Sequence, residues 1–209
     1  MTAYRMFPAE DGPAGTAADS PVILGTEFYC TTPVWLTHLH LWRPPDAGMT
    51  GTVTIRLWRA ESSSLGISEQ DALTVDTSGT GWRTVQLPTP VVLIANQRYR
   101  VSGHYPSGFP ATGAGWTVPR VNGPLVGIET SSALGSAQGS FLYSATHNGM
   151  PTGASFNGAN YWLDVTISDT DPTPTPLGAD SLTVSSQVGK PSFKRNVWKL
   201  VPPTIVDKW

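Results

Sequence analysis

The sequence predicts an all-β fold: a β-sandwich, of jelly-roll or immunoglobulin-like type, with an extended C-terminal arm. Turn residues are abundant, with 21 Gly and 19 Pro among 209 residues, whereas charged residues make up only 13%. This balance suits short strands better than long helices. The single cysteine, Cys30, excludes an intramolecular disulfide, so burial and strand pairing must hold the fold together. We expect Cys30 to be a small buried hydrophobe.

About seven short strands are predicted, each bounded by Gly, Pro, Asn or Ser residues. They cover Val22–Cys30, Val34–Arg43, 51–59, 72–75, 82–87, 99–105 and 160–168. Apolar and polar residues alternate in these stretches with a period of two, which places one face of each strand in the core. The residues expected on inward faces include Val22, Leu24, Phe28, Cys30, Val53, Ile55, Leu57, Tyr161, Leu163, Val165 and Ile167. Only 68–73, SEQDAL, has the pattern of a short helical turn.

The chain divides into four segments. Residues 1–20 are predicted to form an extended lead-in, and 21–168 form the sandwich domain. Candidate anchors in the lead-in are Tyr4, Met6 and Phe7. Within the domain, 106–158 is irregular and rich in Gly, Ser, Ala and Thr, and loops of that length are usually functional. Residues 169–180 form a Pro-rich linker, and 181–209 form a basic, aromatic arm.

Charge divides the chain in a similar way. Residues 1–179 hold eight Arg and no Lys against thirteen Asp or Glu, a net charge of −5, whereas 180–209 carry +3. The total of −2 argues against a nucleic-acid-binding surface, which needs clustered Lys and Arg. The start of the chain lacks a secretory signal pattern, and no stretch is apolar enough to span a membrane. We therefore expect a soluble protein that is not exported by itself.

The arm contains aromatic residues of the kind that anchor protein interfaces and basic residues of the kind that steer association with a partner. Its predicted partner-docking residues are Phe193, Lys194, Arg195, Trp198 and Trp209. So few residues cannot bury this apolar surface alone. We therefore expect the arm to dock on another protein or on a neighbouring copy in a homo-oligomer, a trimer if the protein belongs to a fibre.

No constellation of residues predicts an enzyme. The sequence has no G-x-S-x-G nucleophile elbow, and fragments such as Gly113 to Gly115 are typical of loops rather than phosphate cradles. His38 and His40 share a strand face and could hold a metal with His104, but no partner shows ligand spacing. Three carboxylates that could bind Ca²⁺ match no known loop; they are Asp164, Asp169 and Asp171. We predict neither a metal nor a cofactor.

Eight Trp residues are a high count for this length. Those that strands or loops could expose are Trp58, Trp82, Trp116 and Trp162. Aromatic faces stack on the C–H faces of sugars, so these four are the candidate residues for binding an arabinan or another envelope glycan. The alternative is that most of them pack inside, because each Trp buries about 150–250 Å² in a core that lacks disulfides.

Several stretches resemble a known family. GWRTVQLPTPVVL at 81–93 is followed by RYRVSGHY at 98–105, and NYWLDV stands at 160–165. With smaller matches over about residues 20–168, these runs resemble the family catalogued as domain of unknown function 4082. The resemblance implies a β-sandwich module that is appended to actinobacterial extracellular proteins and also occurs in minor tail proteins of actinobacteriophages. The resemblance implies no catalytic residues, and the basic arm lies outside the residues that match the family.

These observations together favour a non-enzymatic structural protein of a bacteriophage virion. We expect a minor tail or fibre component, assembled in the host cytoplasm, that presents the sandwich for host attachment. Its expected partners are other virion proteins, further copies of itself and a host envelope glycan. The alternative is a carbohydrate-binding module of a bacterial extracellular system, and a third hypothesis is an enzyme of unknown type.

Overall fold

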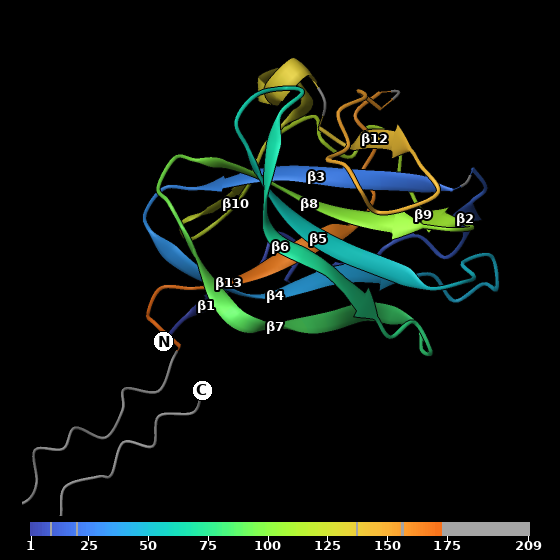
Figure 1. Ribbon diagram of the computed structural model, residues 1–209, viewed down its shortest axis with the longest axis horizontal. Coiled ribbons are helices and arrows are strands. Elements are labelled where there is room, and N and C mark those ends of the chain that lie inside the picture. Colours follow the sequence, from blue (N-terminus) through green and yellow to red (C-terminus); the bar gives the residue numbers. More distant parts are fainter. Residues whose placement is uncertain (9, 20, 137, 156, 173–209) are drawn as a thin grey trace, which may run out of the picture. The chain divides into compact units, whose positions relative to one another are not determined.

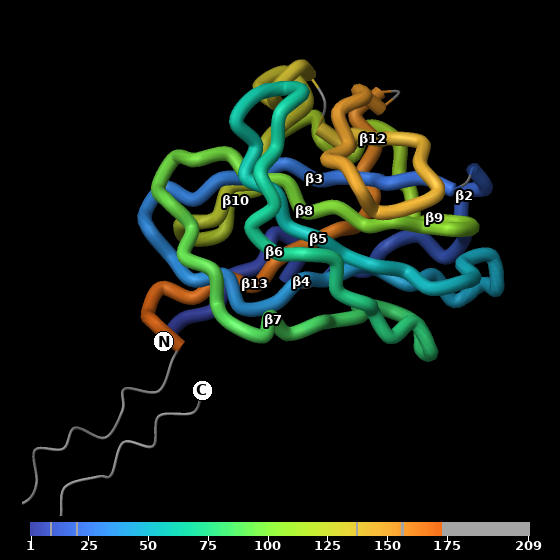
Figure 2. Tube along the Cα trace, viewed as in Figure 1, coloured from blue at the N-terminus to red at the C-terminus, as the bar shows by residue number. Residues whose placement is uncertain are grey.

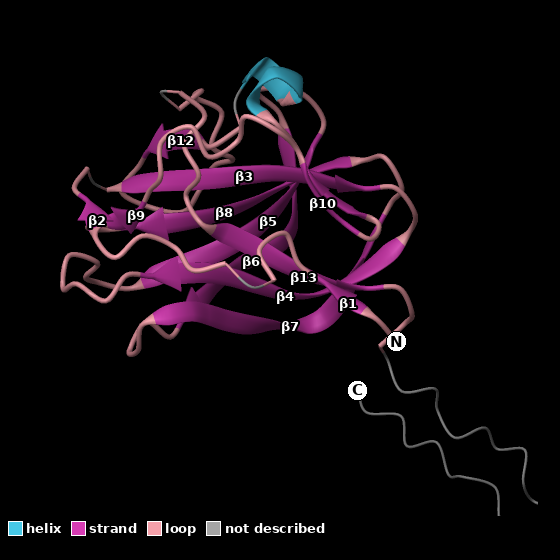
Figure 3. Cartoon of the chain, turned by 180° about the vertical axis from the view of Figure 1, so that it is seen from behind, coloured by secondary structure: helices cyan, strands magenta, loops and turns pink. Residues whose placement is uncertain are grey.

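Two antiparallel β-sheets pack face to face to form a β-sandwich (Figures 1 and 3). The computed structural model describes residues 1–8, 10–19, 21–136, 138–155 and 157–172. The predicted arm and most of the linker lie outside these residues. The described chain has only two helical elements, the 3₁₀ turns η1 (Thr130–Ser132) and η2 (Leu134–Ser136), so the all-β prediction is confirmed. Among these residues no helix has the length and apolar character to cross a membrane.

One sheet has four strands and the other has seven. The order in the four-stranded sheet is β1 (Ala3–Tyr4), β13 (Leu163–Ser168), β4 (Val34–Arg43) and β7 (Gly81–Leu93). The order in the seven-stranded sheet is β10 (Arg120–Asn122), β11 (Leu125–Gly127), β3 (Val22–Cys30), β8 (Arg98–Tyr105), β5 (Val53–Ala60) and β6 (Gly66–Val75), while β12 (Ser140–Tyr143) also pairs with β3. A separate small sheet joins β2 (Thr16–Ala17) to β9 (Phe109–Pro110).

The core lies between the two large sheets and follows the period-two pattern of the sequence. Leu163, Val165 and Ile167 of β13 are fully buried and belong to the same hydrophobic cluster as the inward residues of the facing sheet. Those facing residues include Val22, Leu24, Phe28, Cys30, Val53, Ile55, Leu57 and Val101. The prediction that Cys30 is buried is confirmed, and burial raises the pKa of its thiol to about 12.

The predicted helical turn at 68–73 is wrong. These residues belong to β6, which pairs antiparallel with β5 through contacts such as Ser68 opposite Trp58. The polar sequence suggested a turn because β6 stands at the edge of its sheet, where five of its ten residues are exposed. Pairing with β5 outweighs the weak local preference of a short polar stretch.

The predicted alternation between buried and exposed faces fails in several strands, of which β3 and β13 are two. Glu27 of β3 and Asp164 of β13 lie on the faces turned away from the core, yet both are fully buried. In each case another segment of the chain covers the outer face. The segment over β13 is the N-terminal one, and the segment over β3 is the long stretch between β9 and β13.

The N-terminal segment is part of the domain rather than only a lead-in. The backbone N–H groups of Met6 and Phe7 donate to the Asp164 carboxylate at 2.9 and 3.1 Å, and Arg5 Nε donates to it at 3.0 Å. Met6 and Phe7 are buried, as expected of anchors, and Tyr4 packs against the core cluster. The contacts with Asp164 hold residues 5–7 against the outer face of β13.

Candidate functional site

The stretch between β9 and β13 folds along one edge of β3. In Figure 2 it runs from yellow to orange beside the β3 tube. β8 pairs with one edge of β3, and the other edge is shared by β11, which pairs with Phe28–Cys30, and β12, which pairs with Val22–Gly25. The stretch predicted to be functional therefore carries short strands that fix its position on the sandwich.

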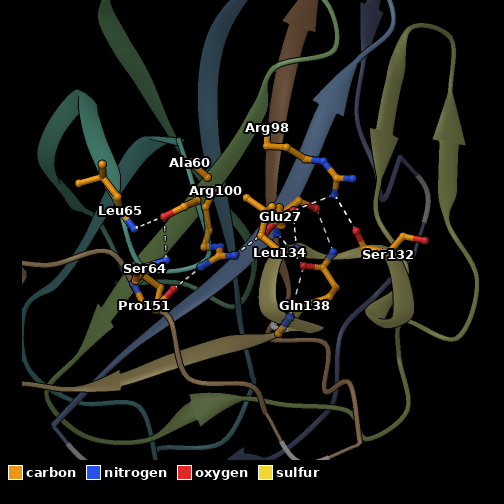
Figure 4. A network of polar contacts seen from close by, with 12 residues as sticks. Glu27, Ala60, Ser64, Leu65, Arg98, Arg100, Ser132, Leu134, Gln138 and Pro151 are labelled. Atoms are coloured by element: carbon orange, nitrogen blue, oxygen red, sulfur yellow. Dashed lines mark hydrogen bonds and ion pairs between the residues drawn. The ribbon is translucent and has the colours of Figure 1, made fainter.

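A buried carboxylate ties this stretch to β3 (Figure 4). Glu27 forms an ion pair with Arg100, whose side chain is also fully buried, and accepts a hydrogen bond from Arg98 Nη1 at 2.9 Å. It also accepts the backbone N–H of Leu134 at 3.2 Å. Gln138 binds the Glu27 backbone twice, since its Oε1 accepts the N–H at 2.6 Å and its Nε2 donates to the carbonyl at 2.9 Å. These contacts fix η2 and the start of β12.

A second group of contacts holds residues 147–151 over the same sheet. Arg100 donates to the carbonyl oxygen of Pro151. The His147 ring lies between two hydroxyls, with Nδ1 at 2.9 Å from Thr54 Oγ1 and Nε2 at 2.8 Å from Ser102 Oγ. Burial lowers the pKa of His147 to about 3, so the ring is neutral at physiological pH. The loop after β12 is therefore fixed by hydrogen bonds at both ends.

A pocket of about 270 Å³ opens between β12, the β2–β9 pair and the chain before β13. It is lined by Asp19, Val22, Leu24, Phe109, Phe141, Tyr143, Ser155 and Tyr161. The Phe109 and Tyr161 rings meet edge to face at 5.9 Å between centroids, and Phe141 and Tyr143 do so at 5.5 Å. We call it the aromatic pocket.

Strand register explains why these side chains meet. Phe141 and Tyr143 are two residues apart on β12, so they project from the same face of that strand. The register places Tyr143 opposite Val22 at the start of β3. In the small sheet Phe109 pairs with Ala17, and Asp19 follows two residues later. Segments far apart in the sequence therefore converge at one end of β3.

The mouth of the aromatic pocket carries an exposed ring beside a carboxylate. The Tyr143 side chain is the exposed member, with 58% of its surface accessible, and its hydroxyl donates a hydrogen bond to the Asp19 carboxylate. That hydrogen bond raises the pKa of Tyr143, so the phenol keeps its proton. Such a site offers a ring face for apolar contact and carboxylate oxygens that accept hydrogen bonds from ligand hydroxyls. The negative charge of the carboxylate disfavours anionic ligands.

The four Trp residues predicted to bind a glycan are mostly buried. Trp58, Trp116 and Trp162 keep only 6%, 1% and 7% of their surface exposed, so the expectation that they are exposed is wrong. Trp58 lies on the outer face of β5, as predicted, but it packs with Met150 and donates from Nε1 to Ser102 Oγ at 2.8 Å. A buried indole has no free face for a sugar.

Phe7 explains why the other three Trp residues are covered. Its ring lies 5.9 Å from Trp82, 5.6 Å from Trp116 and 5.2 Å from Trp162, measured between centroids. Trp82 is half-buried, with the Arg5 guanidinium 4.6 Å from its ring centre. These rings form a packed cluster under the N-terminal segment, which is the alternative that the sequence left open. The structure does not unite the four residues in one site.

The histidines and carboxylates considered as metal ligands do not converge. His40 is buried between Thr84 Oγ1 at 2.8 Å and Thr166 Oγ1 at 2.7 Å, and burial lowers its pKa to about 3. His104 belongs to the other sheet and stacks on His147 instead. The described residues contain no group of three His, Cys, Asp or Glu side chains that could hold a metal ion. Asp164 and Asp169 bind the N-terminal segment instead.

The predicted docking residues of the arm lie outside the described residues, so their docking stays a prediction. Sequence reasoning missed Asp19 and Tyr143 because they are far apart in the chain and neither stands in a motif. The strand at Ser140–Tyr143 was also missed. One signal was available, since Phe141 and Tyr143 alternate with other residues inside a stretch otherwise rich in Gly and Ser.

Comparison with known protein families assigns the chain to a family. A family model described as a domain of unknown function (DUF4082) matches residues 10–163. The match includes the N-terminal residues from Glu10 onward, all the large strands up to the start of β13, and every residue that lines the aromatic pocket. No match to this chain is found among curated proteins. The chain belongs to the family described as domain of unknown function DUF4082.

Proposed function

We propose that the chain is a non-enzymatic attachment protein of a bacteriophage virion, a minor tail or fibre component that binds a neutral glycan of the host envelope through the aromatic pocket. One observation carries the binding part of the proposal. Tyr143 presents a largely exposed ring beside the Asp19 carboxylate at the mouth of a pocket lined by three further aromatic residues. Apolar surface with a few fixed polar groups is typical of small-molecule sites.

The chemistry of this pocket suits a sugar better than other small ligands. The C–H face of a sugar ring can lie on the Tyr143 ring, and its hydroxyls can donate to Asp19. A volume of about 270 Å³ is slightly below the range of about 300–1,000 Å³ that is usual for ligand pockets, which fits one sugar unit rather than a large cofactor. The carboxylate at its mouth favours neutral glycans such as arabinan over acidic ones.

The virion part of the proposal is supported by the family resemblance to minor tail proteins of actinobacteriophages and by the basic, aromatic sequence of 181–209. A carbohydrate-binding module of a bacterial extracellular system is the second candidate, and the same pocket supports it. The two candidates differ in assembly. Antibody labelling of phage particles that carry the protein would distinguish them, because only a virion component stays on purified particles.

Glycan binding is tested with the full chain and purified actinobacterial envelope polysaccharide. Tyr143→Ala should weaken binding about three- to tenfold, the effect of losing one aromatic contact of about 0.5–1.5 kcal/mol. Val92→Ala is a matched control, because Val92 is similarly exposed, at 57%, on the other sheet. Equal binding by wild type and Tyr143→Ala would refute the assignment of the pocket, and absence of binding by wild type would refute glycan recognition.

A further inference from the structure

A second pocket, of about 390 Å³, adjoins the aromatic pocket. It is lined by Trp116, Thr117, Thr130, Ser131, Ser136, Ser155, Asn157 and Gly158. Six of these side chains carry a hydroxyl or an amide, and none is charged. We call it the hydroxyl pocket. Ser155 lines both pockets, so the two share a wall at this residue.

The backbone of the hydroxyl pocket adopts conformations that few residues tolerate. Ser136 and Asn157 have φ angles of 52° and 57°, in the left-handed region that side chains other than Gly rarely adopt. Gly158 follows with φ 59°, and a Cβ there would stand 2.2 Å from Thr130 Oγ1. Position 158 therefore requires glycine, because a Cβ there would prevent the close approach of the Thr130 side chain. Backbone strain of this kind concentrates at ligand sites.

Hydrogen bonds hold the walls of this pocket together. Thr130 N–H donates to the Trp116 carbonyl at 2.9 Å, and Ala114 N–H donates to the Asn157 carbonyl at 3.0 Å. Ser155 Oγ accepts the Ala159 N–H at 2.9 Å. The shape of the pocket is thus fixed by main-chain contacts between segments that are distant in sequence.

Two polar atoms in the walls have no partner within the protein. Trp116 Nε1 and Thr130 Oγ1 are buried and make no hydrogen bond. Trp116 as a whole is 99% buried, with 1% of its surface exposed. A buried donor or acceptor is usually satisfied, so each unsatisfied one calls for an explanation. Both atoms have almost no accessible surface, so a ligand in the pocket cannot reach them, and the polar groups that it can reach are the exposed lining residues Thr117, Ser131, Ser136 and Asn157.

We propose that the hydroxyl pocket is a second subsite for the same glycan, so that the chain recognises an oligosaccharide with one unit in each pocket. This inference rests on the proposed glycan binding by the aromatic pocket. The shared wall at Ser155 brings the pockets together, and uncharged polar walls suit a neutral sugar unit. The ligand class is a neutral oligosaccharide longer than one unit, and a single sugar fills only the aromatic pocket.

Titration of the full chain with arabinose and a ladder of arabino-oligosaccharides tests this inference. Ser131→Trp fills the hydroxyl pocket from an exposed position, and Ser78→Trp at a remote exposed position is its control. Thr117→Val removes an exposed hydroxyl from the pocket lining, so the fold should tolerate it. We expect Thr117→Val to weaken binding of the longer oligosaccharides about three- to tenfold and Ser131→Trp to weaken it at least as much. Neither variant should change binding of the monosaccharide.

The outcomes separate the two proposals. If Ser131→Trp and Thr117→Val bind every oligosaccharide as wild type does, while Tyr143→Ala weakens binding of all of them, the second subsite is wrong and the first stands. If wild type binds no member of the ladder, both proposals fail. Thermal unfolding of each variant shows whether lost binding reflects lost folding, and Thr117→Val keeps the test valid if Ser131→Trp does not fold.

Discussion

The hydroxyl of Tyr143 donates a hydrogen bond to the carboxylate of Asp19, which lies 124 residues earlier in the chain. This contact joins β12 to the segment between β2 and β3 at the mouth of the aromatic pocket. It orients an exposed ring and a charged acceptor toward the same opening. Because this hydrogen bond holds both side chains, a ligand that binds here would lose less entropy in ordering them.

Truncation of β13 should destabilise the sandwich. Leu163 and Val165 are fully buried in the core cluster, so Leu163→Ala should lower the free energy of unfolding by about 2–5 kcal/mol, and Val165→Ala by a smaller amount. Thermal or denaturant unfolding measures both. Val92→Ala, at an exposed position, should change little. Unchanged midpoints for both core variants would mean that the faces of β13 are assigned wrongly.

Removing one partner of the Glu27–Arg100 ion pair should lower the free energy of unfolding more than replacing both partners together. Both side chains are fully buried, so Glu27→Ala leaves the Arg100 charge without its partner and should cost about 3–5 kcal/mol. The double variant Glu27→Leu with Arg100→Met should recover part of this loss, because no buried charge then remains unpaired. Denaturant unfolding of the three proteins gives the comparison, and a double variant as unstable as Glu27→Ala would contradict this account.

Stability should fall as the pH is lowered below about 6.5. Burial lowers the pKa values of His40 and His147 from 6.5 to about 3, so between these limits the unfolded chain binds protons that the folded chain excludes. The contribution of each histidine is complete above pH 6.5 and decreases by up to about 1.4 kcal/mol per pH unit below it. Carboxylates with lowered pKa values, such as Asp46 and Asp76, lose their contribution only below about pH 3.8.

The variant His147→Gln separates the contribution of His147 to the pH dependence of stability from the contributions of the other titratable groups. It should be less stable than wild type at pH 7, where it lacks the two hydroxyl contacts of the ring. Its free energy of unfolding should then fall less steeply than that of wild type between pH 6.5 and 4.5. Parallel curves for the two proteins would show that His147 is protonated in the folded state.

Deletion of 177–209 should leave the sandwich folded but prevent assembly. The described strands all belong to the compact unit Met1–Thr173, so the truncation removes no strand of the sandwich. The deleted sequence contains Phe193, Trp198 and Trp209 among basic residues, a combination typical of interfaces. Incorporation into particles and self-association, measured by sedimentation, should both decrease. Normal assembly of the truncated protein would refute a docking role for the arm.

The sandwich could be predicted because its strands carry a period-two pattern that burial enforces. Val53, Ile55 and Leu57 alternate with polar residues, and β5 follows this pattern in the structure. The outer faces could not be predicted in this way, because Glu27 and Asp164 are buried by segments from elsewhere in the chain. The apolar run around Glu27 in β3 is a signal of burial on both faces, as in strands covered on both sides.

The candidate site was harder to predict because tertiary contacts create it. Asp19, Phe109 and Tyr143 belong to three segments that only the pairing of β2 with β9 and of β12 with β3 brings together. Four Trp residues were glycan-binding candidates because the sequence contains many Trp, but Phe7 packs against three of them. The exposed aromatic residue of the aromatic pocket is Tyr143, which no motif marks.

The most direct test of glycan binding by the aromatic pocket is NMR mapping of the isotopically labelled full chain during titration with fragments of envelope polysaccharide. The predicted result is that the largest shift changes occur at Asp19, Phe141 and Tyr143, while signals of Val92 on the opposite sheet stay in place. The absence of shift changes at saturating polysaccharide, or changes confined to residues outside the aromatic pocket such as Trp82, would contradict the account.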